Sequence, residues 1–232
     1  MFIGHFAVGF ASKPLAPRTS LAWLMAAAQL ADLLWPVFLF LGWEHVRIDP
    51  SATRFTPLDL YDFPLSHSLA ALALWATIFG GIYWLLTRYR AGALVLWFAV
   101  ISHWVLDWIT HRPDMPLYPG GSRFGLRLWD SIAGTMIIEL AMFCAGVWLY
   151  ARATRPRDRI GRFGFAGYVL VMLVLYIGDR FSGPPPDVQS LLWVSIVFAP
   201  LVLAWSWWFD RHRIPVAGET EGVVPGERLP QI

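Results

Sequence analysis

Charged residues are scarce in this sequence: they make up 15% of it, while 57% of its residues are hydrophobic. Soluble domains usually carry about 25% charged residues, so the composition excludes an ordinary soluble domain. The formal net charge is only +2, and the basic residues are scattered between apolar runs. Because no basic stripe is present, the sequence predicts no nucleic-acid partner.

Cysteine is almost absent, and so is a basic amino-terminal region. Cys144 is the only cysteine, which excludes an internal disulfide, and we expect it to be a small buried core residue. The first basic residue, Lys13, follows the apolar start of the chain rather than preceding it. The amino-terminal segment therefore does not resemble a cleaved secretory signal, and we expect it to be retained.

Long apolar runs are the main feature that is present. A membrane helix needs about 20 mostly apolar residues, and six runs meet or approach that length: 21–43, 67–87, 91–110, 131–150, 163–181 and 188–209. The apolar segment 2–12 is too short to cross a bilayer at about 1.5 Å per residue. The sequence therefore predicts an all-α, polytopic membrane helical bundle with six spanning helices and a short N-terminal half-helix.

The basic residues fall into two groups when the connecting segments are assigned to alternate sides of the membrane. The positive-inside rule places the larger group in the cytoplasm. This group contains Lys13, Arg18, Arg88, Arg90, Arg152, Arg155, Arg157, Arg159, Arg162, Arg211, Arg213 and Arg228. The outer group contains Arg47, Arg54, Arg112, Arg123, Arg127 and Arg180. Residues 1–213 are predicted to form the bundle, and the polar residues 214–232 to form a disordered cytoplasmic tail.

Several ionisable residues lie inside the predicted spans, where they are costly and usually functional. His103, Asp107 and His111 are four residues apart and therefore share one helix face. Asp32, His103 and Glu139 lie about 12–15 Å below the outer ends of their helices by helical rise. His67 opens the second span on the same side, and His5 reaches this depth if the half-helix is re-entrant. We expect these side chains to surround one point.

Such a set of imidazoles and carboxylates, without a thiolate, suits Zn²⁺, and Mn²⁺ or Fe²⁺ are alternatives. The predicted metal ligands are His5, Asp32, His67, His103, Asp107 and His111. Asp32 and Glu139 are the predicted catalytic residues, Asp32 as a ligand or base and Glu139 as a general base or an orienter of a ligand. The outer-loop residues His45, Asp49, Asp59 and Asp62 are expected to be solvated, while Arg112 and Arg123 could receive an anionic head group.

The chain resembles the bacterial inner-membrane-associated metal-dependent hydrolases, and in particular an uncharacterised membrane-bound branch of that family. The resemblance covers about residues 1 to 150. It rests on Gly4-His5, Ala31-Asp32, Ser66-His67-Ser68, and Ser102-His103 followed by Asp107. It implies a metal site and a hydrolytic reaction in the bacterial inner (cytoplasmic) membrane.

Two departures from that family pattern reduce the number of ligands. Typical members carry a second Asp two residues after the first-span Asp, where this chain has Leu34. They also often carry a His before the His-Ser pair, where this chain has Asp62 and Phe63. The resemblance therefore favours one metal ion over two.

The function predicted from the sequence is that of a multi-pass inner-membrane protein with a divalent-metal site near the outer leaflet. As a hydrolase it would act on a lipid or lipid-linked phosphoester, with membrane lipids as its partners. One alternative is a transporter or permease with an intramembrane His/Asp relay, although no inverted repeat is visible. A second is a haem protein, which the surrounding carboxylates disfavour, and a third is a non-catalytic accessory subunit. The substrate and the oligomeric state do not follow from the sequence.

Overall fold

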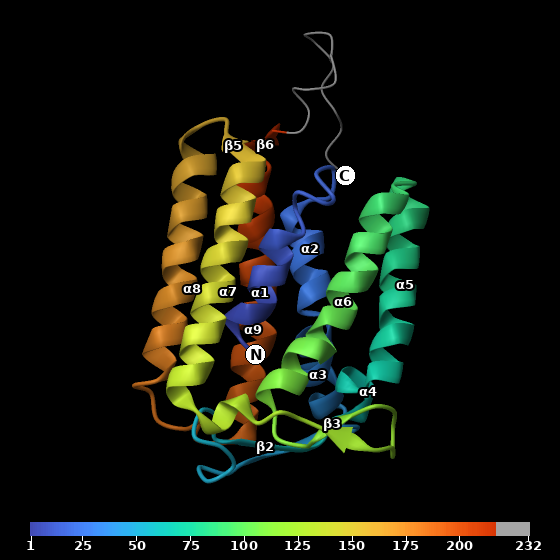
Figure 1. Ribbon diagram of the computed structural model, residues 1–232, viewed down its shortest axis with the longest axis vertical. Helices are drawn as coiled ribbons and strands as arrows, with labels where there is room; N and C mark the ends of the chain where they lie inside the picture. Colours follow the sequence, from blue (N-terminus) through green and yellow to red (C-terminus); the bar gives the residue numbers. More distant parts are fainter. Residues whose placement is uncertain (217–232) are drawn as a thin grey trace.

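The computed structural model describes residues 1–216, and this part of the chain is a helical bundle with short antiparallel strand pairs at its two ends (Figure 1). The α-helices are α1 (Ile3–Ala11), α2 (Leu21–Ala28), α3 (Leu30–Phe40), α4 (Pro64–His67), α5 (Leu69–Thr87), α6 (Arg90–Thr110), α7 (Ile132–Ala153), α8 (Phe165–Asp179) and α9 (Val188–Asp210). A 3₁₀ turn, η1 (Leu128–Asp130), precedes α7, and a π-helical turn, η2 (Ile160–Gly164), leads into α8. The predicted all-α class is confirmed.

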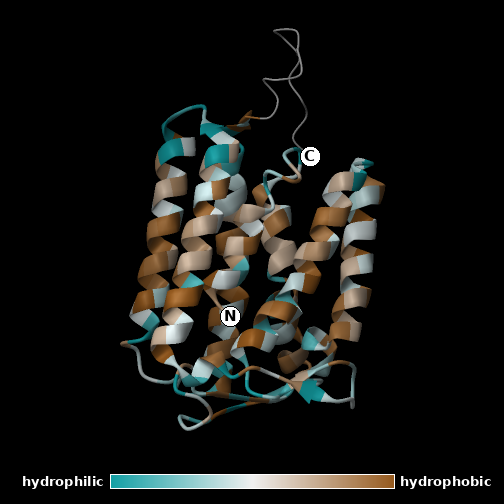
Figure 2. Cartoon of the chain, viewed as in Figure 1, coloured by the Kyte–Doolittle hydropathy of each residue, from teal (hydrophilic) through white to brown (hydrophobic). Residues whose placement is uncertain are grey.

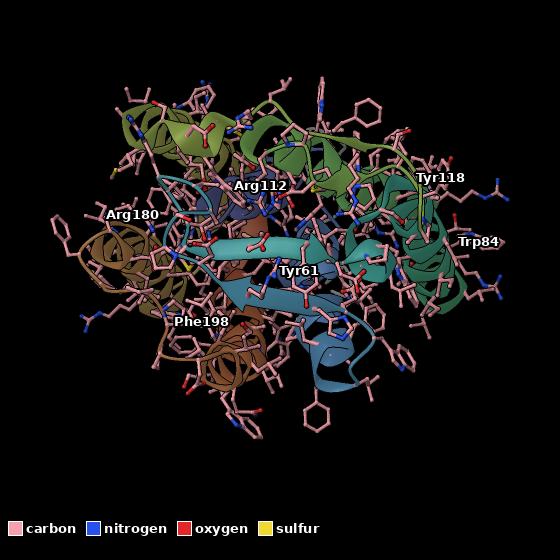
Figure 3. All side chains as sticks on the ribbon, turned by 90° about the horizontal axis from the view of Figure 1, so that it is seen from below. Tyr61, Trp84, Arg112, Tyr118, Arg180 and Phe198 are labelled. Carbon is pink, nitrogen blue, oxygen red and sulfur yellow. The ribbon has the colours of Figure 1, made fainter. Side chains whose placement is uncertain are left out.

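The strands form three two-stranded antiparallel pairs. They are β1 (His45–Ile48) with β2 (Leu58–Asp62), β3 (Met115–Pro116) with β4 (Arg123–Phe124), and β5 (Thr154–Pro156) with β6 (Arg213–Pro215). The first two pairs lie at one end of the bundle, and β5–β6 lies at the opposite end (Figure 1). Seen from below, the β1–β2 hairpin, on which Tyr61 is labelled, crosses the end of the helices (Figure 3).

Within residues 1–216, five helices are long and apolar enough to cross a membrane: α5, α6, α7, η2 continued by α8, and α9. Helices α2 and α3 form a sixth span if the bent pair is counted as one. The predicted number of six is confirmed on that count. The prediction of one uninterrupted helix over residues 21–43 is wrong, because the backbone of Gln29 leaves the helical region and the chain bends by 59° there.

Helix α1 is the predicted half-helix, and it lies in the interior of the bundle (Figure 1). It packs mainly against α7 and α2. A Cβ atom added at Gly146 of α7 would come within 2.4 Å of the carbonyl oxygen of Ala7, so only glycine fits there. Close backbone approach at glycine is a common way for membrane helices to associate. The segment is therefore buried in protein rather than peripheral.

The turn after α1 is held by a buried ion pair at the predicted cytoplasmic end. Nζ of Lys13 donates to Oδ2 of Asp210 at 2.8 Å and to the carbonyl oxygen of Thr19 at 2.9 Å. Asp210 also accepts hydrogen bonds from the Leu21 amide (2.8 Å) and from the Tyr150 hydroxyl (2.6 Å). Because the charged atoms of both side chains have several partners, the pair is well compensated in the interior.

Two apolar core clusters meet at α1 and α2. One is centred on α2, α3, α5 and α6, and the other contains residues of α1, α2, α7, α8 and α9. Hydrophobic residues predominate in the middle of the helices, and hydrophilic residues gather at the two ends of the bundle (Figure 2). This distribution is what a membrane-spanning bundle requires.

Two further predictions concern Cys144 and the carboxy-terminal tail. Cys144 is exposed on α7, so the prediction that it is a buried core residue is wrong; a lipid-facing position accepts a small apolar side chain equally well. Of the predicted tail 214–232, Ile214 and Pro215 belong to β6 and pair with β5, while residues 217–232 lie outside the part of the chain that the structure describes.

Candidate metal centre

Four helices bring the predicted ligands together on the side of the bundle where β1–β4 lie. His5 comes from α1, Asp32 from α3, His67 from α4, and His103 with Asp107 from one face of α6. His5, His67, His103 and Asp107 are at most 5% exposed. The convergence expected from helical spacing and depth is therefore present in the geometry.

Asp107 is at the centre of the cluster. Its Oδ1 lies 3.0 Å from Nε2 of His5 and also accepts a hydrogen bond from the amino group of Met1. Its Oδ2 lies 3.1 Å from Nε2 of His103, 3.8 Å from Nε2 of His111 and 3.9 Å from Nε2 of His67. One carboxylate thus faces four imidazole rings.

Asp32 approaches the same histidines from α3. Its Oδ1 lies 3.5 Å from Nε2 of His67 and 3.8 Å from Nε2 of His103. The Asp32 side chain is 42% exposed, whereas those of His67, His103 and Asp107 are no more than 6% exposed. Asp32 therefore closes the cluster on the side that is open.

The hydrogen-bond partners of His103 and His67 determine where their ring protons lie. Nδ1 of His103 is 2.9 Å from the carbonyl oxygen of Ala28, which can only accept, so Nδ1 carries the hydrogen. Ala28 is the last residue of α2 before the bend, where helical carbonyl groups lack helical partners.

For His67 the same conclusion follows through two partners. Oγ of Ser66 donates to Oε2 of Glu44 at 2.6 Å, so its contact of 2.6 Å with Nδ1 of His67 requires the ring to donate. Glu44 is 1% exposed and also accepts from the amides of Leu65 and Ser66. With Nδ1 protonated in both rings, Nε2 is the nitrogen that faces the carboxylates, and it can act as a metal ligand.

This arrangement fits a bound cation. Nε2 of His103 is buried and has no hydrogen-bond partner among the described residues. An imidazole nitrogen and a carboxylate that face each other in a buried site are stabilised by a proton or a metal cation between them. Two ligands bound at about 2.1 Å to a tetrahedral ion lie about 3.4 Å apart, which is close to the separations of 3.1 to 3.9 Å around Asp107 and Asp32.

Two overlapping groups of three could hold such an ion within residues 1–216: His5, His103 and Asp107, and Asp32, His67 and His103. His111, also a predicted ligand, belongs to neither group. Its Nδ1 lies 2.9 Å from Oδ1 of Asp114, and its ring packs on Trp129 with centroids 4.1 Å apart. His111 therefore stands at the outer rim, where α6 ends.

Glu139 is buried at the depth of the cluster but contacts backbone rather than an imidazole ring. Its Oε2 accepts hydrogen bonds from the amides of Phe2 (2.8 Å) and Gly4 (3.1 Å). These amides open α1, which has no side-chain cap of its own, and a carboxylate is favourable at a helix N-terminus. Glu139 thus holds the helix that carries His5.

The outer-loop residues His45, Asp49, Asp59 and Asp62 were expected to be solvated, and three of them form ion pairs. Asp59 is 8% exposed and bonds to Arg47 and Arg112, so for Asp59 that prediction is wrong. His45 and Asp62 remain exposed and pair with each other at 2.8 Å. Partial burial disfavours the charged guanidinium of Arg112, but its bonds to Asp114 and its interaction with Asp59 raise the pKa above its ordinary value. Arg112 is thus engaged by carboxylates of the protein itself, and Arg123 donates to the carbonyl oxygen of Tyr61.

Glu44, Ser66, Asp114 and the carbonyl group of Ala28 were not identified from the sequence as groups that orient the histidines. Ser66 and Asp114 stand within three residues of the histidines that they contact, and this proximity was an available signal. Glu44 is separated from Ser66 by 22 residues and meets it only because the β1–β2 hairpin returns the chain to the bundle.

The apolar helices of spanning length define the class of the protein, a multi-pass α-helical membrane protein, and the His/Asp cluster lies inside this bundle. The model of the family described as YdjM inner membrane protein matches residues 1–183, and all the cluster residues fall inside this range. The chain therefore belongs to the YdjM inner membrane protein family, and it is a multi-pass protein of the inner membrane. No curated protein and no solved structure matched the chain. The expected membership of a bacterial inner-membrane family is confirmed at this level.

Proposed function

We propose that the His/Asp cluster binds one divalent metal ion, most suitably Zn²⁺, and that the protein is a metal-dependent hydrolase acting on a lipid or lipid-linked phosphoester. The observation that carries the proposal is the convergence of the Nε2 atoms of His67 and His103 on the carboxylates of Asp32 and Asp107. Imidazole and carboxylate ligands at these separations suit Zn²⁺, and Mn²⁺ or Fe²⁺ are compatible.

The residues of the cluster divide into those that would hold the ion and those that would orient them. His5, His67, His103 and Asp107 are the proposed ligands, and Asp32 would act as a ligand or as the base. Glu44 with Ser66, and the carbonyl group of Ala28, set the tautomers of His67 and His103. Such orienting partners typically change metal affinity or activity by about 10- to 100-fold.

A divalent ion in this position would supply Lewis acidity, which makes bound water more acidic and polarises a phosphoryl group. Asp32 is the best proton acceptor for attacking water, because its side chain is the one that opens out of the cluster. The phosphorus–oxygen bond to the leaving alcohol would break, and that alcohol would take up a proton. The depth of the cluster within the bundle favours a substrate that is itself a membrane lipid.

The test is metal analysis of the purified protein together with the His103→Ala variant. We expect about one equivalent of metal in the wild type and its loss in His103→Ala, since His103 belongs to both groups of three. His212→Ala is the matched control, because His212 is partly exposed and contacts Asp158 far from the cluster. Assay of lipid phosphoesters with and without a chelator tests the reaction.

The rival functions give different results in the same experiments. The relay of a transporter would be favoured by two results together: absence of metal from the wild type, and loss of proton-coupled uptake in His103→Ala. Normal metal content in His103→Ala would place metal binding elsewhere. Bound metal without turnover of any phosphoester would favour an accessory subunit.

A further inference from the structure

A pocket of about 170 Å³ lies beside the candidate metal centre, between α1, α3 and α9, with Gln29 of the α2–α3 bend in its wall. Its wall is mostly apolar, with Phe6, Phe198 and Val202 among the lining residues. Asp32 lines the same pocket, and it is the cluster residue whose side chain is 42% exposed. The open side of the cluster is thus this pocket.

Two buried polar groups line the pocket without partners. Oε1 of Gln29 and Nε1 of Trp35 have no hydrogen-bond partner among the described residues, and the two side chains belong to residues only 7% and 9% exposed. An unsatisfied buried polar atom is costly, more so in a membrane interior where water is scarce. A ligand that places an acceptor such as a phosphate oxygen at Nε1 of Trp35, and a donor such as a hydroxyl group at Oε1 of Gln29, would satisfy both atoms.

A second, larger cavity of about 650 Å³ continues the pocket towards the β1–β2 end of the molecule. The two spaces share Phe2, Ser195 and Phe198 as lining residues. The larger cavity is also lined by Arg54 and Arg180, and Nε of Arg180 is buried without a partner among the described residues. Asp179 is the one carboxylate in its lining and forms an ion pair with Arg180, so the excess positive charge of the lining side chains comes from Arg54.

We propose that these two connected spaces bind one anionic phospholipid, which reaches the cluster laterally between α3 and α9. The phosphate lies in the inner pocket beside Asp32 and accepts a hydrogen bond from Trp35. The part of the polar head group beyond the phosphate occupies the larger cavity with Arg54 and Arg180, whose charges disfavour a cationic head group, and the acyl chains follow the apolar residues Phe198 and Val202 of α9. This inference rests on the proposed function, because it supplies the substrate class for that site.

The experiment is photolabelling of the purified full-length protein by a phosphatidylglycerol with a photoreactive acyl chain. Ala199 lines the inner pocket, so Ala199→Trp should remove most of the labelling by filling the space. Val197→Trp is the matched control on the same helix, because Val197 is 55% exposed and lines neither of these two spaces. Labelled peptides of the wild type should come from α1, α3 and α9.

Trp35→Phe keeps an aromatic ring in the pocket wall and removes the N–H donor, so it remains informative if Ala199→Trp does not fold. Loss of one hydrogen bond should weaken lipid binding by a factor of about ten or less. A phosphatidylcholine probe with the same chain should label more weakly than the anionic lipid. Equal labelling of Ala199→Trp and Val197→Trp, or equal binding of the anionic lipid to Trp35→Phe and wild type, would overturn the proposal.

Metal content and turnover distinguish this proposal from the proposed function. Ala199→Trp and Trp35→Phe should retain the metal of the wild type, since neither residue belongs to the cluster. Pocket-dependent labelling of a protein that carries no metal would overturn the hydrolase and leave the lipid site standing. Turnover of a short-chain phosphoester that is unaffected by Ala199→Trp, together with unchanged lipid labelling, would overturn the lipid site and leave the hydrolase.

Discussion

Each of three imidazole rings around Asp107 has one nitrogen engaged by a group outside the cluster. His67 is held by Ser66, His103 by the carbonyl oxygen of Ala28, and His111 by Asp114. The opposite nitrogen of each ring then points to Oδ2 of Asp107. Rings fixed in this way do not need to rotate or change tautomer to bind an ion, which lowers the cost of binding.

Glu44 gives the sharpest test at the residue scale. In Glu44→Gln, an amide NH₂ replaces the oxygen that accepts the Ser66 hydroxyl hydrogen, so Ser66 no longer requires His67 to donate. We expect metal affinity to fall by about 10- to 100-fold, measured by competition with a chelator. Asp62→Asn is the control, because Asp62 pairs with exposed His45 on the outer hairpin. Unchanged affinity in Glu44→Gln would contradict the role of Glu44.

Residue chemistry and helical spacing predicted the members of the cluster, because the cost of ionisable groups in lipid makes each of them conspicuous. His103 and Asp107 follow from the four-residue spacing alone. Glu44 could not be found this way, because it lies in a loop, where a carboxylate carries no such cost. Its burial depends on how the β1–β2 hairpin folds, which no local pattern encodes.

At the scale of the element, α1 has each end held by a carboxylate from another helix. Glu139 of α7 accepts from the amides of Phe2 and Gly4 at its start. Asp210 of α9 binds Lys13 just beyond its end. A helix of 9 residues has little stability of its own, so these contacts and its apolar packing fix the position of His5.

Replacement of Lys13 should show how much this anchoring contributes. Lys13→Met leaves the buried Asp210 carboxylate without its cation, and we expect a loss of about 3 kcal/mol in the free energy of unfolding. The measurement is reversible unfolding in detergent micelles. Arg18→Met is the control, since Arg18 is exposed and lies over the ring of Tyr89, and its effect should stay within about 0.5 kcal/mol. Equal effects of the two variants would show that the Lys13–Asp210 pair does not anchor α1.

The half-helix could be predicted from its length, because the apolar run is too short to span, but only the structure distinguishes a segment buried in the bundle from a peripheral one. The bend between α2 and α3 could not be predicted. Pro36, the residue in that run that most disfavours a helix, lies within α3 rather than at the bend. The bend occurs at Gln29, where the carbonyl group of Ala28 becomes the partner of His103. That tertiary contact between α2 and α6 is not encoded in local propensity.

At the scale of the whole molecule, the two ends of the bundle differ in charge and in structure. The Arg-rich segment around β5 and β6 lies at one end, while β1 to β4 and the candidate metal centre lie towards the other. The composition and the apolar runs predicted this layout because lipid dictates both the length and the polarity of a span. The two cavities were not predictable, since they arise from packing between α3, α8 and α9.

The orientation can be checked with single cysteines in a Cys144→Ala background. We expect Ser122→Cys, between β3 and β4, to react with a membrane-impermeant thiol reagent added to the periplasmic side of intact cells. Arg157→Cys, beside β5, should react only after the inner membrane is opened. The reason is the excess of basic residues at the β5–β6 end. The reverse pattern of labelling would invert the orientation and put the candidate metal centre near the cytoplasmic leaflet.

The depth of the cluster has an electrical consequence. His103 lies seven residues before the end of α6 at Thr110, or about 10 Å along the helix axis, which is about a third of a hydrocarbon core of about 30 Å. An ion that reaches this depth from outside crosses that share of the transmembrane potential, which contributes about 2.3 kcal/mol per unit charge per 100 mV. For a divalent cation and a cell interior that is negative, about 1.5 kcal/mol per 100 mV would favour binding. An energised membrane would therefore hold the ion about tenfold more tightly than a detergent micelle does.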